Sequence, residues 1–171
     1  MASRTLIDPG AIRKRVSELA RQIASDFEGH DLIALVVLKG SMFFAVDLLR
    51  DMERELAVDV IQVSSYGKEK YSSGVVTILK EPQLDMHGKA VLIIEDIIDS
   101  GFTIREVYRY IEGRGASPVR VVSFLDKPAS RKTEFNPDYV GFTIEPHFVV
   151  GYGLDYAEKY RNLPEIRILA E

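Results

Sequence analysis

The sequence predicts an α/β fold, a mostly parallel twisted sheet flanked by helices, with a small lobe in the C-terminal third. Two apolar runs, residues 32–38 and 91–94, read like strands that are buried on both faces of a sheet. Segments with helical spacing of apolar residues alternate with these runs, as they do in parallel sheets covered by helices. Three short strand-like segments with few helical residues between them end the chain, at 139–144, 148–153 and 166–170.

The first helix is expected to begin at Asp8-Pro9, where the aspartate can cap free amides and the proline loses no hydrogen bond. Apolar residues then recur at helical spacing: Ile12, Val16, Leu19, Ala20, Ile23 and Phe27. The strand at 32–38 leads through the turn Lys39-Gly40-Ser41 into a second predicted helix, over roughly residues 42–55.

The middle of the chain predicts further strands at 59–65, 75–79 and 119–125, with a polar stretch between the first two. A third helix should follow the strand at 91–94; it carries Ile104, Val107, Tyr108 and Ile111 and ends at Gly113 and Gly115. Ligands of such sheets bind beyond the carboxyl ends of the strands. Lys39, Glu95 and Lys127 each follow an apolar strand, so they are expected to share one rim.

Composition excludes several classes of function. A chain of 171 residues, 46% apolar and 28% charged, is expected to form one domain over residues 1–171. A net charge of −4 without clustered Lys and Arg argues against a nucleic-acid partner. The lack of cysteine excludes disulfides, thiolate metal sites and cysteine nucleophiles. Because no apolar run resembles a signal peptide or a membrane span, the expected location is the cytoplasm.

Residues 91–104, VLIIEDIIDSGFTI, place three acids before a glycine turn that opens a helix. Gly101 can adopt backbone angles closed to other residues, so that successive amides at the helix N-terminus bind an anion such as phosphate. Carboxylates repel phosphate, so the acids indicate ribose hydroxyls or a divalent cation on the same ligand. This combination suggests a phosphorylated ribose. The alternative is an unspecialised, receiver-like α/β loop whose acids only interact with the helix N-terminus.

The same stretch resembles the phosphoribosyl-pyrophosphate (PRPP) loop of type I phosphoribosyltransferases, in the form seen in bacterial hypoxanthine (hypoxanthine-guanine) phosphoribosyltransferases. The resemblance continues in order through LKGS (38–41), SSYG (64–67), LDKP (125–128) and FVVGYGLDYAEKYRNLPEI (148–166). It implies the type I phosphoribosyltransferase fold with a C-terminal hood. It also implies purine salvage: magnesium-dependent transfer of the 5-phosphoribosyl group from PRPP to N9 of hypoxanthine and/or guanine, giving IMP or GMP and pyrophosphate.

The resemblance assigns the PRPP side of the site as follows. The 5′-phosphate would lie on Ser100, Gly101, Phe102 and Thr103, and Glu95 and Asp96 would handle the ribose hydroxyls and Mg²⁺. Pyrophosphate would contact Arg161 and the turn formed by Lys39 and Gly40. The Leu38–Lys39 peptide of this turn is often cis in the family. Asp155 would bind a second Mg²⁺ and would also belong to the purine-binding residues.

On the purine side, the resemblance implies that Asp99 is the general base that removes the N7 proton. Lys127 would donate to the 6-oxo group, Phe148 would stack on the purine, and the backbone of Val149 would read its edge. Ser65-Tyr66 would belong to a lid loop that closes over the reacting atoms.

Three alternatives stay open: an enzyme acting on xanthine and guanine, one acting on a pyrimidine, and a PRPP-sensing regulator without turnover. Lys127 and Phe148-Val149 favour a 6-oxopurine without selecting one. Regulators of this family often lose base-site residues, whereas Asp99, Lys127, Phe148 and Asp155 are all present. The expected partners are PRPP and a purine base, with neither nucleic acid nor membrane, and the family implies a homodimer or homotetramer.

Overall fold

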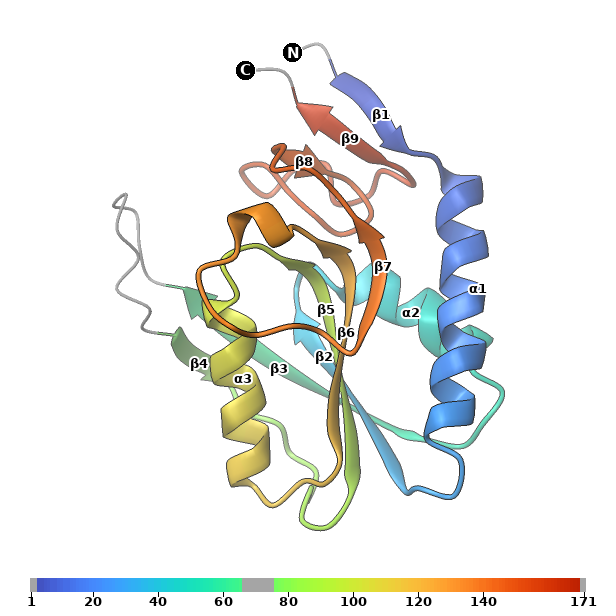
Figure 1. Cartoon of the computed structure of the whole chain (residues 1–171), viewed down its shortest axis with the longest axis vertical. Coiled ribbons are helices and arrows are strands. Elements are labelled where there is room, and N and C mark those ends of the chain that lie inside the picture. The colour runs from blue at the N-terminus through green and yellow to red at the C-terminus, as the bar shows by residue number, and fades with distance from the viewer. Residues whose placement is uncertain (1–2, 66–75, 170–171) are drawn as a thin grey trace.

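The computed structural model describes residues 3–65 and 76–169. Its main sheet is built from β2 (Leu32–Leu38), β3 (Ala57–Ser65), β4 (Val76–Lys80), β5 (Ala90–Ile98), β6 (Val119–Asp126) and β7 (Tyr139–Thr143). These six strands lie in the order β4-β3-β2-β5-β6-β7 (Figure 1). Every neighbouring pair is parallel except β3 and β4. The predicted α/β class with a mostly parallel sheet is therefore confirmed.

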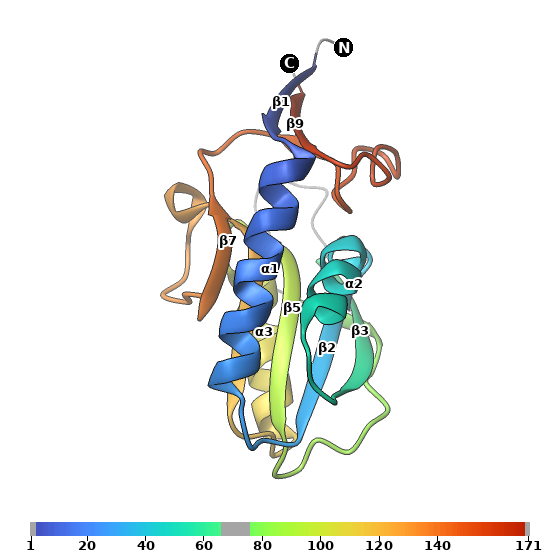
Figure 2. The same cartoon turned by 90° about the vertical axis from the view of Figure 1, so that its right-hand side faces the viewer.

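Helices cover both faces of this sheet. One face carries α1 (Pro9–Asp26) and α2 (Met42–Asp51), and the other carries α3 (Phe102–Gly113), as Figure 2 shows. Alternate residues of one strand serve the two layers, so that Ala34 packs with α1 and α2 while Ile33 packs with α3. This two-sided burial explains the unbroken apolar runs in the sequence. No helix in the described part of the chain is long and apolar enough to span a membrane.

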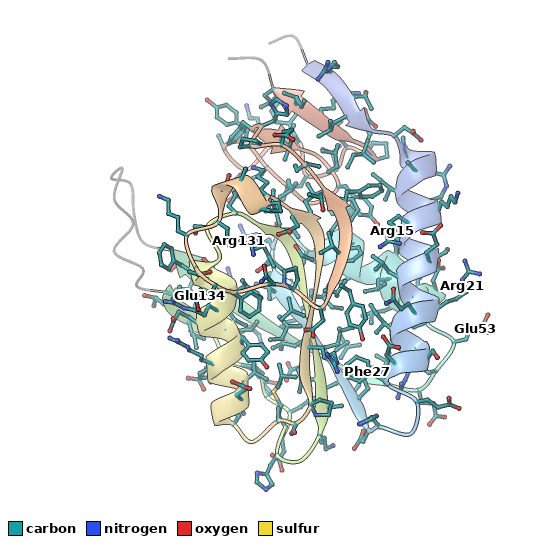
Figure 3. The ribbon with its side chains drawn as sticks, viewed as in Figure 1. Arg15, Arg21, Phe27, Glu53, Arg131 and Glu134 are labelled. Carbon is teal, nitrogen blue, oxygen red and sulfur yellow. The ribbon has the colours of Figure 1, made fainter. Side chains whose placement is uncertain are left out.

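The start of the first helix follows its prediction. The Asp8 carboxylate accepts hydrogen bonds from the amides of Gly10 at 2.8 Å and Ala11 at 3.0 Å. The predicted apolar stripe of α1 is buried against the sheet. Arg15 reaches from this helix to β7 and donates to two of its carbonyl oxygens (Figure 3). The helix is thus tied to the edge strand of the sheet.

The second helix is shorter than predicted, because it ends at Asp51 rather than near residue 55. Met52 adopts an extended conformation and its side chain is buried in the core. Arg54 donates to the carbonyl oxygens of Phe27 and His30, just beyond the end of α1. These contacts hold the chain in an extended path that a continued helix would not follow.

The strand that contains the acids is longer than its apolar run. It pairs with β6 through Ile98, and Glu95 lies opposite Ser123 within the ladder. The expectation that Glu95 follows the strand was therefore wrong: the strand includes both Glu95 and Asp96. Backbone pairing with β6 continues past the point where the side chains become polar.

A small second sheet lies beyond the carboxyl ends of the main strands (Figures 1 and 2). It has the order β1-β9-β8, made of β1 (Ser3–Ile7), β8 (Val149–Val150) and β9 (Ile166–Leu169). We call it the hood. The predicted small lobe is present, but two details were wrong. The hood includes an N-terminal strand, and β7 extends the main sheet instead, because it pairs in parallel with β6.

Candidate active site

A cavity of about 470 Å³ opens at the carboxyl ends of β2, β3 and β5. Seven residues predicted for the site line it: Lys39, Gly40, Glu95, Asp96, Thr103, Asp155 and Arg161. They come from the turn after β2, the end of β5, the start of α3 and the segment that joins β8 to β9. The fold therefore gathers these residues at the rim where parallel sheets bind their ligands.

The turn after β2 depends on glycine. The Leu38–Lys39 peptide is cis, and a Cβ added at Gly40 would overlap the Asp96 carboxylate. The segment between β8 and β9, which we call the hood segment, approaches the same turn. A Cβ added at Gly153 of this segment (φ +106°) would overlap the carbonyl oxygen of Gly40. The missing side chains let the turn, the acid and the hood segment approach one another closely.

Glu95 and Asp96 form a pair of acids in a poorly solvated place. Glu95 is 6% exposed, and its Oε1 accepts a hydrogen bond from the Asp96 amide at 3.0 Å. Burial, and then the neighbouring charge of Asp96, raise the pKa of Glu95 well above its usual range. Burial also raises the pKa of Asp96, although its hydrogen bonds and the charge of Arg161 partly oppose this. A cation or hydroxyl donors would stabilise the charged pair.

These acids suit a metal that is bound together with a substrate. Across residues 3–65 and 76–169, no three His, Cys, Asp or Glu side chains converge as a ready-made metal cluster. Asp155, predicted to hold a second Mg²⁺, pairs with Arg161 at 2.8 Å. Mg²⁺ commonly takes one or two carboxylates from the protein and its other ligands from phosphates and water. The Glu95–Asp96 pair fits that pattern.

The turn at residues 100–103 has the features of an anion site. Gly101 adopts a left-handed conformation with φ +86° and is the N-cap residue of α3, without a side-chain cap. No residue in the described ranges accepts a hydrogen bond from the amides of residues 100–103. Ser100, Gly101 and Phe102 lead to Thr103, which lines the cavity. Free amides at a helix N-terminus attract a phosphate.

A carboxylate and an ammonium group lie side by side next to this turn. Lys127 Nζ is 3.0 Å from Asp99 Oδ1; the lysine side chain is 9% exposed and the aspartate side chain 52%. The register of β5 and β6 brings them together, since the Lys127 amide donates to the Ile98 carbonyl oxygen. The pair presents one acceptor and one donor to a ligand that lies over the strand ends.

Residues 5–157 match the phosphoribosyl transferase domain, and this range includes the acid pair and the amide turn. The chain belongs to the phosphoribosyltransferase family. The hypoxanthine-guanine phosphoribosyltransferases of Bacillus subtilis and Aquifex aeolicus are 43% and 42% identical to this phosphoribosyltransferase. The matches cover 97% and 94% of the present chain and 92% and 90% of those proteins.

A longer relative and two solved structures agree with this assignment. The bifunctional protein TilS/HprT of Listeria monocytogenes is 46% identical over 97% of this phosphoribosyltransferase, which spans about a quarter (26%) of that protein. A hypoxanthine phosphoribosyltransferase from Staphylococcus aureus has a TM-score of 0.94 at 39% identity, covering 98% of this chain and 91% of its own. A hypoxanthine-guanine phosphoribosyltransferase from Bacillus anthracis has a TM-score of 0.94 at 42% identity, covering 98% of both chains. The predicted type I phosphoribosyltransferase fold is confirmed.

Within residues 3–65 and 76–169, the other predicted residues of this phosphoribosyltransferase do not line the cavity. Phe148 is 54% exposed, with its ring edge-on to Tyr156 at a centroid distance of 5.7 Å. Val149 is buried in β8. Ser65 ends β3, whereas Tyr66 and the rest of the predicted lid, through residue 74, lie outside the described residues.

Glu158 and Arg131, which the sequence did not single out, contact predicted site residues. Glu158 lies 3.1 Å from Lys39 and 3.5 Å from Arg161, measured from its two carboxylate oxygens. Arg131 donates from Nε to the carbonyl oxygen of Asp99 at 3.1 Å. Neither has a local signal beyond its place within or just after a family motif, because the contacts of Glu158 with Lys39 and of Arg131 with Asp99 form only when distant segments meet.

Proposed function

We propose that the chain catalyses magnesium-dependent transfer of the 5-phosphoribosyl group from PRPP to N9 of hypoxanthine and/or guanine. The products are IMP or GMP and pyrophosphate. One observation carries this proposal: a turn with free amides directly follows a buried acid pair at the rim of one cavity. That arrangement suits a ligand with both a phosphate and a sugar-bound cation. The names of the full-length relatives support the same reaction.

PRPP would be anchored by its sugar and its 5′-phosphate. The amides of residues 100–103 donate to the phosphate, and Glu95 and Asp96 accept from the ribose hydroxyls. When bound, Mg²⁺ neutralises charge between this acid pair and the pyrophosphate group. The raised pKa of Glu95 supports such a cation, because the pair is costly to ionise alone.

Pyrophosphate would lie against Lys39, the backbone of Gly40 and Arg161, all of which line the cavity. Lys39 pairs with Glu158 through side chains that are 55% and 67% exposed. Exposed ion pairs of this kind contribute little free energy, so pyrophosphate oxygens can replace the carboxylate. Asp155, next to Arg161, would contact a second Mg²⁺.

The chemical step exchanges two bonds at C1′ of the ribose. The bond to the pyrophosphate oxygen breaks, positive charge develops on the ribose, and the N9 lone pair forms the new bond. The N7 proton becomes more acidic as N9 bonds to carbon, and Asp99 removes it as general base. For this, the Asp99 carboxylate turns from Lys127 to the purine. Pyrophosphate leaves with the electron pair of the broken bond.

Purine selection would rest on Lys127 and the hood. The Lys127 ammonium donates to a 6-oxo group and rejects adenine, whose 6-amino group is itself a donor. The exposed ring of Phe148 is free to stack on the base, and the Val149 backbone would contact its edge. Ser65 and Tyr66 would belong to the lid that keeps water from the charged ribose.

The Asp99–Lys127 pair separates the regulator from the enzymes. A xanthine-guanine or pyrimidine phosphoribosyltransferase would use a similar PRPP site with a different base preference. A PRPP-sensing regulator needs neither a proton acceptor nor a donor to a 6-oxo group. The close pairing of Asp99 with Lys127 therefore favours catalysis on a 6-oxopurine.

One assay separates these possibilities. Purified protein with PRPP and MgCl₂ would be given hypoxanthine, guanine, xanthine or uracil in parallel, with nucleotide formation followed by chromatography. Conversion of hypoxanthine or guanine is expected. PRPP binding without turnover of any base would indicate the sensor, and preferred turnover of xanthine or uracil would indicate a sister enzyme.

We also propose that residues 1–171 form one domain and assemble as a homodimer or homotetramer. Exposed apolar side chains on α2 support self-association: Met42 is 42% exposed, Phe43 37% and Val46 47%. Sedimentation velocity on wild type and Val46→Asp tests this. We expect an oligomer for wild type and a shift toward monomer for the variant.

A further inference from the structure

Arg131 lies between η1 (Pro128–Ser130) and β7, close to the N-terminal end of α3 (Figure 3). Its side chain is only 10% exposed. Nε donates to the Asp99 carbonyl oxygen at 3.1 Å, and the two terminal nitrogens bind the Phe135 carbonyl oxygen and the Asp126 carboxylate. A planar guanidinium bonded at all three nitrogens is held in a fixed orientation.

The two residues after Arg131 continue the contact. The Lys132 amide donates to the Ser100 carbonyl oxygen at 2.9 Å, and Thr133 Oγ1 lies 3.4 Å from the same oxygen. A Cβ added at Gly101 would overlap Thr133 Oγ1 and would lie 2.8 Å from Arg131 Cδ. We call residues 131–133 the buttress, because they pack directly against the turn at residues 99–101.

The buttress determines which way the amides of the turn face. In a trans peptide the C=O and N–H groups point in opposite directions. Because the carbonyl groups of Asp99 and Ser100 face the buttress, the amides of Ser100 and Gly101 face away from it. A flip of either peptide would place a carbonyl oxygen where an anion needs a donor.

We propose that Arg131 is a positioning residue for the PRPP site, an inference that rests on the function proposed above. It fixes the peptides at 99–101, and with them the phosphate donors and the main chain from which the Asp99 carboxylate extends. Two adjacent residues of the β6 end then control Asp99 together. Asp126 holds its main chain through Arg131, and Lys127 holds its carboxylate directly.

Calorimetric titrations with IMP and, separately, with inorganic pyrophosphate in MgCl₂ test this role. We expect Arg131→Met to weaken IMP binding about tenfold or more, because the phosphate donors lose their fixed orientation. Pyrophosphate affinity should change by less than about twofold, since Lys39 and Arg161 do not contact the buttress. Arg131→Lys keeps the charge but loses the planar guanidinium with its three donor nitrogens, and should give an intermediate loss of IMP affinity.

Arg109→Met is the matched control, because Arg109 is an α3 arginine that is 63% exposed and pairs with Glu106 at the surface. It should bind IMP like the wild type. If Arg131→Met does not fold, Thr133→Val tests the buttress in its place. We expect the KM for PRPP to rise about threefold at nearly constant kcat.

The outcomes distinguish the inference from the proposed function. Unchanged IMP affinity in folded Arg131 variants, even with a lower Tm, would reduce Arg131 to a stabilising residue and overturn the inference. Equal losses for IMP and pyrophosphate would also overturn it, because they indicate general damage. A wild type that fails to bind IMP would instead contradict the function itself.

Discussion

Gly153 of the hood segment meets Gly40, in the turn after β2, backbone to backbone, with no room for a methyl group between Gly153 and the Gly40 carbonyl oxygen. Gly153 also has φ +106°, which side chains rarely tolerate. On the other side of the turn, Gly40 leaves the space that the Asp96 carboxylate occupies. The position of the hood segment over the cavity thus depends on two missing side chains.

Replacing Gly153 with alanine should therefore open the cavity. We expect kcat/KM for PRPP to fall by about tenfold or more, because the added methyl group displaces the segment that carries Asp155 and Arg161. Steady-state kinetics measure the loss. Gly113→Ala, at the end of α3 with nothing within 4 Å of its added Cβ, is the control and should keep wild-type kinetics. Equal kinetics for the two variants would contradict close packing at Gly153.

Asp99→Asn tests the general base. The amide is nearly isosteric but does not take up the N7 proton, so kcat should fall by roughly 10²–10⁴-fold. IMP affinity should change far less, because the phosphate donors are untouched. Asp31→Asn, which alters a surface ion pair with Lys89, serves as the control. A wild-type kcat in Asp99→Asn would assign proton removal to another group.

Removing the metal should stop turnover without unfolding the protein. We expect EDTA to abolish nucleotide formation and added MgCl₂ to restore it. The Tm by calorimetry should not change in the absence of substrate, because the described residues form no ready-made metal cluster. Turnover that persists in EDTA would argue against the metal role of Glu95 and Asp96.

The loop after β4 gives a prediction for acid stability. The Asp59 carboxylate accepts hydrogen bonds of 2.7 to 2.8 Å from three amides, those of Val60, Gln83 and Leu84. Burial alone would raise the pKa of Asp59, but these bonds and the nearby charge of Lys80 lower it overall. The pKa is then lower in the folded than in the unfolded state. The stabilisation is present above the unfolded pKa and is lost as the pH falls through the folded pKa.

We therefore expect Asp59→Asn to be less stable than wild type at pH 7, and the difference to shrink below about pH 4. Urea unfolding at several pH values measures it. Asp31→Asn should show a small difference at every pH, because its ion pair is exposed. A gap between wild type and Asp59→Asn that widens on acidification would show that the sign is wrong.

The parts of the fold that the sequence predicts well are those with local causes. Two-sided burial makes a strand uniformly apolar, as at 32–38, and Asp8 caps the helix that begins at the next residue. The membership of β1 in the hood has no such cause, because it depends on the pairing of Ser3 with Leu169. The end of α2 was misplaced for the same reason, since Arg54 bonds to carbonyl groups beyond α1.

The candidate site also has some features with local causes and others that depend on distant segments. The left-handed conformation of Gly101 and the free amides after it follow from the order of residues in one short stretch. The hydrogen bond from Arg131 to the Asp99 carbonyl oxygen does not follow from a local stretch, because it forms only when the chain returns after β6. The family resemblance supplied the purine-side residues, whose roles stay predictions.

The pairing of β1 with β9 has a consequence for biosynthesis. The first strand of the hood must wait for a partner that is translated after every strand of the main sheet. A nascent chain can therefore complete the main sheet before the hood can form. A chain that stops before β9 would leave β1 and β8 without the strand that joins them in the hood.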